Sequence, residues 1–148
     1  MKLFTIGYEG LSQDGFLTWL RYFDINVVAD VRELPLSRKK GFSKNGLSDF
    51  LMEQNIQYFS YRDLGVPKDK RNKLRESGDY KSFFRLIRKS INDKTDLLDN
   101  ICRMIHQGKK VALLCYERDP EKCHRTIVAD EVKKRDVNGL TIKHIKPL

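Results

Sequence analysis

Apolar residues follow two alternating patterns along the chain. Short runs such as 3–8, 26–31 and 109–115 are almost uninterrupted, which is typical of strands buried on both faces of a parallel sheet. Longer segments between them place apolar residues three and four positions apart, as in helices with one buried face. The alternation predicts an α/β fold in which helices cover both faces of a sheet.

Five strands and their connecting helices can be assigned from these patterns. Strands are expected at 3–8, 26–31, 56–61, 109–115 and 140–145. Helices are expected after Ser12, around 47–55, from Tyr80 to His106 with a break at Asn92-Asp93, and from Pro120 onward. Residues 64–78 carry dense charge and a Gly-Val-Pro turn, and predict an exposed loop that could carry a helical turn. We expect residues 1–148 to form a single α/β domain, a three-layer sandwich with a mainly parallel, Rossmann-like sheet of about five strands.

Composition narrows the class of protein. With 148 residues, 40% hydrophobic and 33% charged, the chain is large enough to bury a core without metals or disulfides. No apolar run approaches the ~20 residues that cross a bilayer, and residues 1–6 lack the features of a signal peptide. Three cysteines, an odd number, favour free thiols in a reducing compartment. We therefore expect a cytoplasmic protein with no membrane partner.

The formal net charge of +9 favours a polyanionic partner, either nucleic acid or a phosphorylated small molecule. The basic residues gather in two segments expected to be loops. One lies between Arg32 and Lys44 and contains Arg38. The other lies between Arg62 and Arg75.

Ligands of open parallel sheets bind beyond the carboxyl ends of the strands, where the connections diverge. Three strands end in polar residues there: Gly7-Tyr8, Asp30 with Arg32, and Cys115 with Glu117. The long helical excursion 64–108 is expected to bring the fourth strand beside the first. A site between Gly7-Tyr8 and Cys115-Glu117 follows, where Asp30 either orients an arginine or simply ties loops together.

The stretch after the fourth strand concentrates reactive side chains. Asp119 and Pro120 have the pattern of an N-cap and first helical residue. Cys123, His124 and Arg125 would then lie near a helix N-terminus, where the helix dipole favours a thiolate or a bound anion. Core packing of Cys115 and Cys123 is the alternative for each cysteine taken alone.

Spacing argues against several chemistries. A cysteine phosphatase needs an arginine after five intervening residues, but in that position after Cys115 and Cys123 stand Glu121 and Ala129. Structural zinc is disfavoured because the neighbours Cys123 and His124 would point about 100° apart on a helix. Sulfur transfer by Cys115 is secondary, because nearby carboxylates oppose thiolate formation.

Hydrolysis at a phosphate or glycosidic centre is the remaining hypothesis. Glu117 or Asp30 would serve as general base or hold a divalent cation, and His124 would transfer protons. Negative charge would be stabilised by basic and hydrogen-bonding side chains: Arg32, Arg38, Arg125 and Tyr8. Tyr8, Phe42 and Tyr61 could stack on bases, or each could equally belong to the core. A non-catalytic nucleic-acid-binding module and a small-molecule thiol enzyme are the alternatives.

With these motifs assembled, the chain resembles the family called domain of unknown function 488. The resemblance rests on Thr5-Ile6-Gly7-Tyr8, Asp30-Val31-Arg32, Pro35-Leu36-Ser37-Arg38, Tyr61 to Gly65, Cys115-Tyr116-Glu117 and Cys123-His124-Arg125. Val66 stands where the family usually has a second glycine. The resemblance implies a compact α/β domain and supports the location of the site, but it leaves the reaction open.

Overall fold

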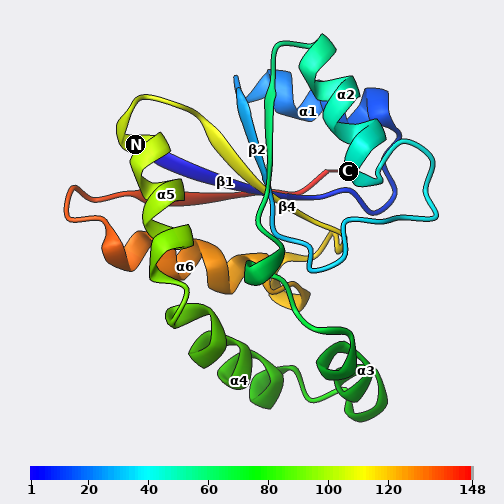
Figure 1. The fold of residues 1–148 in the computed structure, drawn as a ribbon, viewed down its shortest axis with the longest axis vertical. Helices are drawn as coiled ribbons and strands as arrows, with labels where there is room; N and C mark the ends of the chain where they lie inside the picture. Colours follow the sequence, from blue (N-terminus) through cyan, green and yellow to red (C-terminus); the bar gives the residue numbers. More distant parts are fainter. Residues whose placement is uncertain (148) are drawn as a thin grey trace.

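The computed structural model describes residues 1–147 and contains one sheet of five parallel strands (Figure 1). The strands are β1 (Lys2–Gly7), β2 (Val27–Asp30), β3 (Gln57–Ser60), β4 (Val111–Cys115) and β5 (Thr141–Ile145). They lie in the order β3-β2-β4-β1-β5, and every neighbouring pair is parallel. The predicted parallel α/β fold is confirmed.

Helices cover both faces of this sheet. One face carries α1 (Gln13–Tyr22) and α2 (Lys44–Glu53), and the other carries α5 (Thr95–His106) and α6 (Arg125–Arg135). Beyond α6 lies α4 (Tyr80–Asn92), which is followed outward by α3 (Lys68–Ser77) (Figure 1). Two 3₁₀ turns, η1 (Arg62–Leu64) and η2 (Pro120–Lys122), precede α3 and α6. The result is a three-layer arrangement with two apolar cores.

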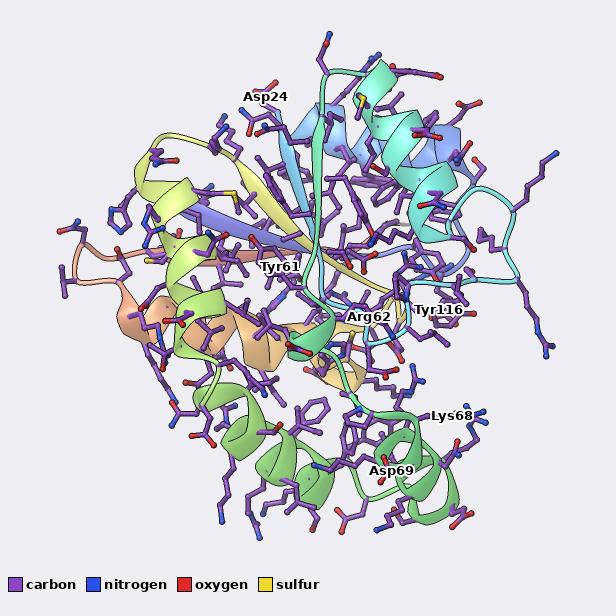
Figure 2. The ribbon with its side chains drawn as sticks, viewed as in Figure 1. Asp24, Tyr61, Arg62, Lys68, Asp69 and Tyr116 are labelled. Carbon is purple, nitrogen blue, oxygen red and sulfur yellow. The ribbon has the colours of Figure 1, made fainter. Side chains whose placement is uncertain are left out.

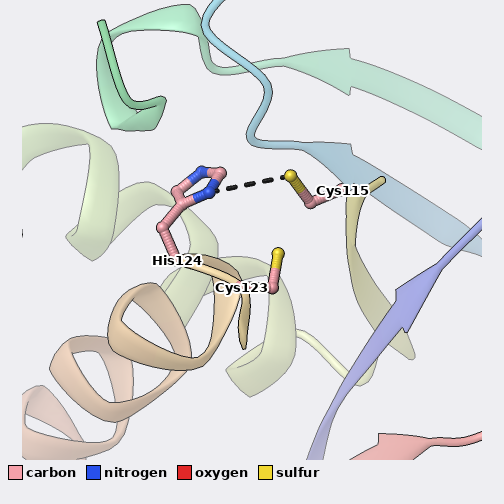
Figure 3. A group of neighbouring side chains, drawn as sticks. All are labelled: Cys115, Cys123 and His124. Carbon is pink, nitrogen blue, oxygen red and sulfur yellow. Dashed lines mark hydrogen bonds between the residues drawn. The ribbon is translucent and has the colours of Figure 1, made fainter. Parts of the chain in front are cut away.

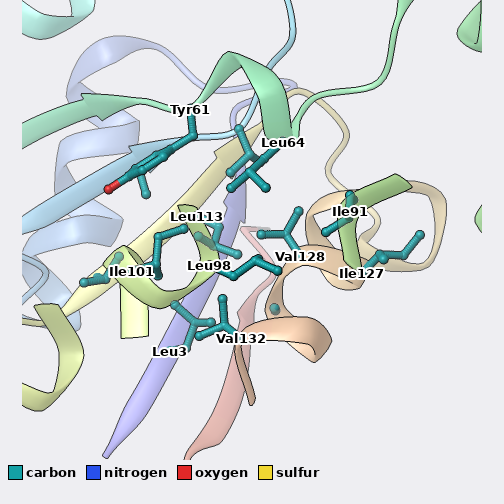
Figure 4. Close-up of a cluster of buried hydrophobic side chains, with 14 of the residues drawn as sticks. Leu3, Tyr61, Leu64, Ile91, Leu98, Ile101, Leu113, Ile127, Val128 and Val132 are labelled. Atoms are coloured by element: carbon teal, nitrogen blue, oxygen red, sulfur yellow. The ribbon is translucent and has the colours of Figure 1, made fainter. Parts of the chain in front are cut away.

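The central strand β4 contributes to both cores, which explains its uninterrupted apolar sequence. Ala112 and Leu114 pack toward α1 and α2, whereas Leu113 and Cys115 pack toward α5 and α6. Side chains alternate in this way because successive residues of a strand point to opposite faces. Figure 4 shows Leu113 in the core between the sheet and helices α5 and α6. Cys115 therefore points to the α6 side of the sheet.

The topology makes the connections diverge around β4. The connection after β1 crosses the α1 face to reach β2, and the connection after β4 crosses the α6 face to reach β5. The prediction that β4 lies beside β1 is confirmed, and β4 also pairs with β2. Adjacent strands whose connections leave on opposite faces create a crevice at their carboxyl ends.

Two predicted elements were wrong. Residues 64–78 are largely helical, not a loop, because α3 has no buried residue and thus lacks the apolar stripe by which helices are recognised. The helix expected from Pro120 is instead the short turn η2, capped by the Asp119 carboxylate, and α6 starts only at Arg125. Among residues 1–147 no helix is long and apolar enough to span a membrane.

The end of β1 approaches the loop after β4 so closely that only glycine fits. A Cβ at Gly7 would lie 1.8 Å from the carbonyl oxygen of Glu117. We expect Gly7→Ala to lower the free energy of unfolding by about 3 kcal/mol or more, since backbone must move to accept the methyl group. Urea titration followed by circular dichroism measures this loss.

Gly46→Ala is the matched control, because Gly46 lies exposed within α2 with open space around it. There alanine should raise stability by up to about 1 kcal/mol through helix propensity. Equal stability of the wild type and Gly7→Ala would contradict the close approach of the two loops.

Candidate active site

Cys115, Cys123 and His124 converge beyond the carboxyl end of β4 (Figure 3). Cys115 is the last residue of β4, Cys123 lies between η2 and α6, and His124 is the N-cap of α6. The Sγ atom of Cys115 lies 3.6 Å from Nδ1 of His124. Cys123 has an extended backbone, with φ −131° and ψ 137°, so its side chain joins the other two instead of following a helical path.

The imidazole of His124 is held by its other nitrogen. Nε2 lies 2.7 Å from the carbonyl oxygen of Val31, to which it can only donate. This bond fixes the ring so that Nδ1 faces Cys115. All three residues are buried, so solvent has little access to the cluster. Cys115, Cys123 and His124 together are called the floor of the site below.

Arg125 supports this floor from behind. Its guanidinium is fully buried and donates to the backbone carbonyls of Glu117 and Arg118, which holds the loop after β4 against α6. The guanidinium that was predicted to bind phosphate thus also braces the backbone, and its Nε atom is buried without a hydrogen-bond partner among the described residues. The Oε2 atom of Glu117 is buried without a hydrogen-bond partner among the described residues.

The cluster changes the acidity of its members. Burial acts to raise the pKa of Cys123, but hydrogen bonds from Cys115 and His124 outweigh it, and the pKa lies well below its usual value. The pKa of Cys115 is raised by its hydrogen bond to Cys123 and by burial. Burial, followed by the charge of Cys123, raises the pKa of Glu117 to about 7. The cluster thus favours the thiolate form of Cys123 and opposes that of Cys115.

Asp30 lies outside this cluster and serves another purpose. Its buried carboxylate binds the guanidinium of Arg32 at 2.9 and 2.7 Å and accepts a hydrogen bond from the Tyr58 hydroxyl. Arg32 also donates to the Tyr8 hydroxyl and the Phe42 carbonyl. With its oxygens occupied, Asp30 does not fit the predicted role of general base. Asp30 positions Arg32, which is buried apart from a small surface that contributes to the lining of the site.

A cleft of about 590 Å³ opens above the cluster. Cys115, Glu117 and His124 contribute to its lining, together with Tyr8, Arg32 and six further charged side chains: Glu33, Arg38, Lys68, Arg71, Arg75 and Lys122. Figure 2 shows Lys68 on α3 on the same side of the molecule as Tyr116, which follows β4. Basic side chains from three separate segments therefore line the same cleft as Cys115, His124 and Glu117.

A second hollow of about 770 Å³ adjoins the first and shares Glu117 and Lys122 with it. Its other charged residues are mainly acidic: Glu9, Asp119 and Glu121 with Arg118 and Lys146. Because it lacks the buried cysteines and histidine, we place the reacting centre in the basic cleft.

A family model matches residues 12–132, which contain Asp30, Cys115 and the Cys123-His124-Arg125 motif. The chain belongs to the family described as Domain of unknown function DUF488. The resemblance predicted from sequence is confirmed. No curated protein and no solved structure matches the chain significantly. Membership of the DUF488 family thus comes without an activity.

Sequence reasoning missed the contribution of α3. Lys68, Arg71 and Arg75 are three and four residues apart, a spacing that places them on one face of a helix. That spacing was the available signal, but the segment was predicted to be a loop. The predicted stacking residues also need correction, because Tyr8 and Phe42 stack on each other within the core and Tyr61 is buried. Tyr116 is the exposed aromatic residue at the cleft.

The Asp30–Arg32 pair should dominate the stability of this region. Asp30→Asn would leave the Arg32 cation buried without its counter-charge, and we expect a loss of about 3–5 kcal/mol in unfolding free energy. Asp49→Asn, on the exposed face of α2, should change stability by less than about 0.5 kcal/mol. Urea unfolding of both variants tests this, and similar small losses would refute the buried pair.

Proposed function

We propose that this DUF488 protein is an enzyme that acts on a nucleic acid or nucleotide by hydrolysis at a phosphate or glycosidic centre. One observation carries the proposal: a cleft lined by basic side chains is also lined by the buried Cys115 and His124 and the half-buried Glu117. Binding groups and reactive groups thus share one cavity.

The cleft is suited to a phosphate-bearing ligand. Arg38, Lys68 and Arg75 are exposed, so their charges are available to a ligand. Arg71 is less exposed and makes only a long ion pair, 3.8 Å, with Glu33. Guanidinium groups bind phosphate through paired hydrogen bonds, and a net charge of +9 attracts polyanions over longer distances. We therefore assign phosphate binding to these side chains instead of the buried Arg125.

Glu117 is the side chain best placed to move a proton. Both ring nitrogens of His124 already have partners, Cys115 and Val31, whereas Oε2 of Glu117 has none among residues 1–147. A carboxylate beside the reacting centre can serve as a general base toward water. His124 in this proposal holds the geometry of the floor.

A thiol enzyme is the second candidate, supported by the contact between Cys115 and His124. A cysteine beside an imidazole is a common nucleophile pair. This reading predicts that iodoacetamide alkylates the cluster cysteine of depressed pKa, Cys123, in parallel with loss of activity, and that ligand affinity does not depend on nucleic-acid length. The three cysteines are free, which also supports the proposed cytoplasmic location.

Salt-dependent binding tests the polyanion part of the proposal. We expect fluorescent single-stranded or double-stranded DNA or RNA to bind, with affinity falling as salt rises. Replacing both Arg71 and Arg75 by alanine should weaken binding and reduce the slope of log K against log salt by about 1.4–1.8, if each arginine contacts one phosphate. Fluorescence anisotropy across a salt series measures both effects.

Lys2→Ala with Lys133→Ala is the control of equal charge, because both lysines are exposed and lie outside the lining of the cleft. If the two double variants weaken binding equally, the binding is a nonspecific attraction by net charge and not a property of the cleft. No binding at low salt would refute the nucleic-acid proposal and favour the thiol enzyme.

Glu117→Gln separates an enzyme from a binding module. We expect turnover of a bound substrate to fall by about 10²- to 10⁴-fold while affinity stays within about twofold, because the amide keeps the shape but cannot accept the proton. Turnover is followed by separating labelled products. Unchanged turnover would remove Glu117 from the mechanism, and binding without turnover in the wild type would favour the non-catalytic module.

A further inference from the structure

We infer that Cys115, Cys123 and His124 bind one zinc ion whose fourth coordination position faces the basic cleft. Two sulfur atoms and an imidazole nitrogen are the donors that zinc prefers. In this structure the three donor atoms all lie within 4.8 Å of one another (Figure 3). Binding itself does not rest on the proposed function, although a catalytic use of the metal does.

The structure removes the objection that the sequence raised against zinc. That objection placed Cys123 and His124 on consecutive positions of one helix, pointing apart. Cys123 is instead extended and precedes α6, while His124 has the first helical dihedral angles. The change of backbone direction between the two residues turns their side chains toward Cys115.

The separation of the donors fits a tetrahedral ion. With Zn–S near 2.3 Å and Zn–N near 2.05 Å, a sulfur and a nitrogen on one ion stand about 3.6 Å apart. The Sγ atom of Cys115 and Nδ1 of His124 are 3.6 Å apart. An S–H···N hydrogen bond has the same length, so this distance alone does not distinguish a hydrogen bond from a zinc site. The other contacts of the three residues must decide between them.

The surroundings of His124 are those of a metal ligand. Its Nε2–H donates to the carbonyl of Val31, which aims Nδ1 at the sulfurs and makes it the ring nitrogen available to a metal. Histidines that bind metals usually donate their other N–H to a carbonyl or carboxylate in this way.

The charge of the site and its access from the cleft both favour zinc. Two thiolates would balance the charge of a zinc ion inside a site where Cys123 is only 1% exposed. Cys115 and His124 line the cleft, so a fourth ligand can approach from there. Beside them the Oε2 atom of Glu117 is buried without a described partner. Three protein ligands with one open position are typical of catalytic zinc, whereas structural zinc has four.

A second group of potential ligands, Cys102, His106 and Asp136, is less suited. The carboxylate of Asp136 already accepts hydrogen bonds from the backbone of Asn138 and Leu140, and also contacts His106. Cys102 and His106 lie in the C-terminal part of α5 and Asp136 follows α6, so this group is near the amino ends of β4 and β5, away from the cleft. It provides a control within the same chain.

Metal content of the purified protein is the direct test. Mass spectrometry of metals should find about one zinc per chain in the wild type grown with zinc. Cys123→Ser and His124→Ala should each retain less than about 0.1 equivalent, whereas Cys102→Ser should retain the full amount. Loss of zinc in Cys102→Ser alone would assign the metal to the other group and overturn the inference.

Cobalt substitution keeps the test decisive if a variant fails to fold. Chelator-treated wild-type protein, shown by circular dichroism to be folded, should take up Co²⁺ and develop thiolate-to-cobalt absorption bands, which Zn²⁺ should then abolish. Absence of both zinc and cobalt binding in folded wild-type protein would refute the site. Because these measurements use no nucleic acid, they remain valid even if the polyanion proposal fails.

Discussion

The insertion of β4 between β2 and β1 is the constraint on which the site depends. Beyond the regular ladder, the amide of Val31 donates to the carbonyl of Leu114, and the amide of Tyr8 donates to that of Cys115. These bonds extend the pairing on both sides of β4 past its end. They also fix the Val31 carbonyl, which then receives the N–H of His124. A site residue on α6 is thus oriented by the backbone that follows β2.

A buried charge pair holds the next part of the edge. Asp30 and Arg32 tie the end of β2 to the Tyr8 hydroxyl and to the carbonyl of Phe42, in the loop before α2. A buried ion pair costs desolvation and adds little net stability over an apolar packing, but removing one partner is severe. We interpret the pair as a means of fixing loop positions at a place where side chains must remain polar.

The sequence predicted the elements whose chemistry is local. Nearly uninterrupted apolar runs located β1, β2 and β4, shorter mixed runs located β3 and β5, and the polar residues at the strand ends located Cys115 and Glu117 at the correct edge. The bond between His124 and Val31 joins residues 93 positions apart and follows only from the placement of β4 beside β2. Apolar periodicity could not reveal α3 either, because that helix buries no residue.

Basic residues in this protein divide into two kinds that composition cannot distinguish. Arg32 and Arg125 are buried, and their guanidinium groups are engaged with a carboxylate, a hydroxyl and backbone carbonyls. Arg71 and Arg75 lie on a helix whose side chains have no core to fill. A phosphate can displace water from an exposed arginine at little cost, but it would have to break the internal bonds of a buried one. The positive charges exposed at the cleft therefore come from α3 and the loop after β2, while Arg32 and Arg125 fix the backbone around Cys115 and His124.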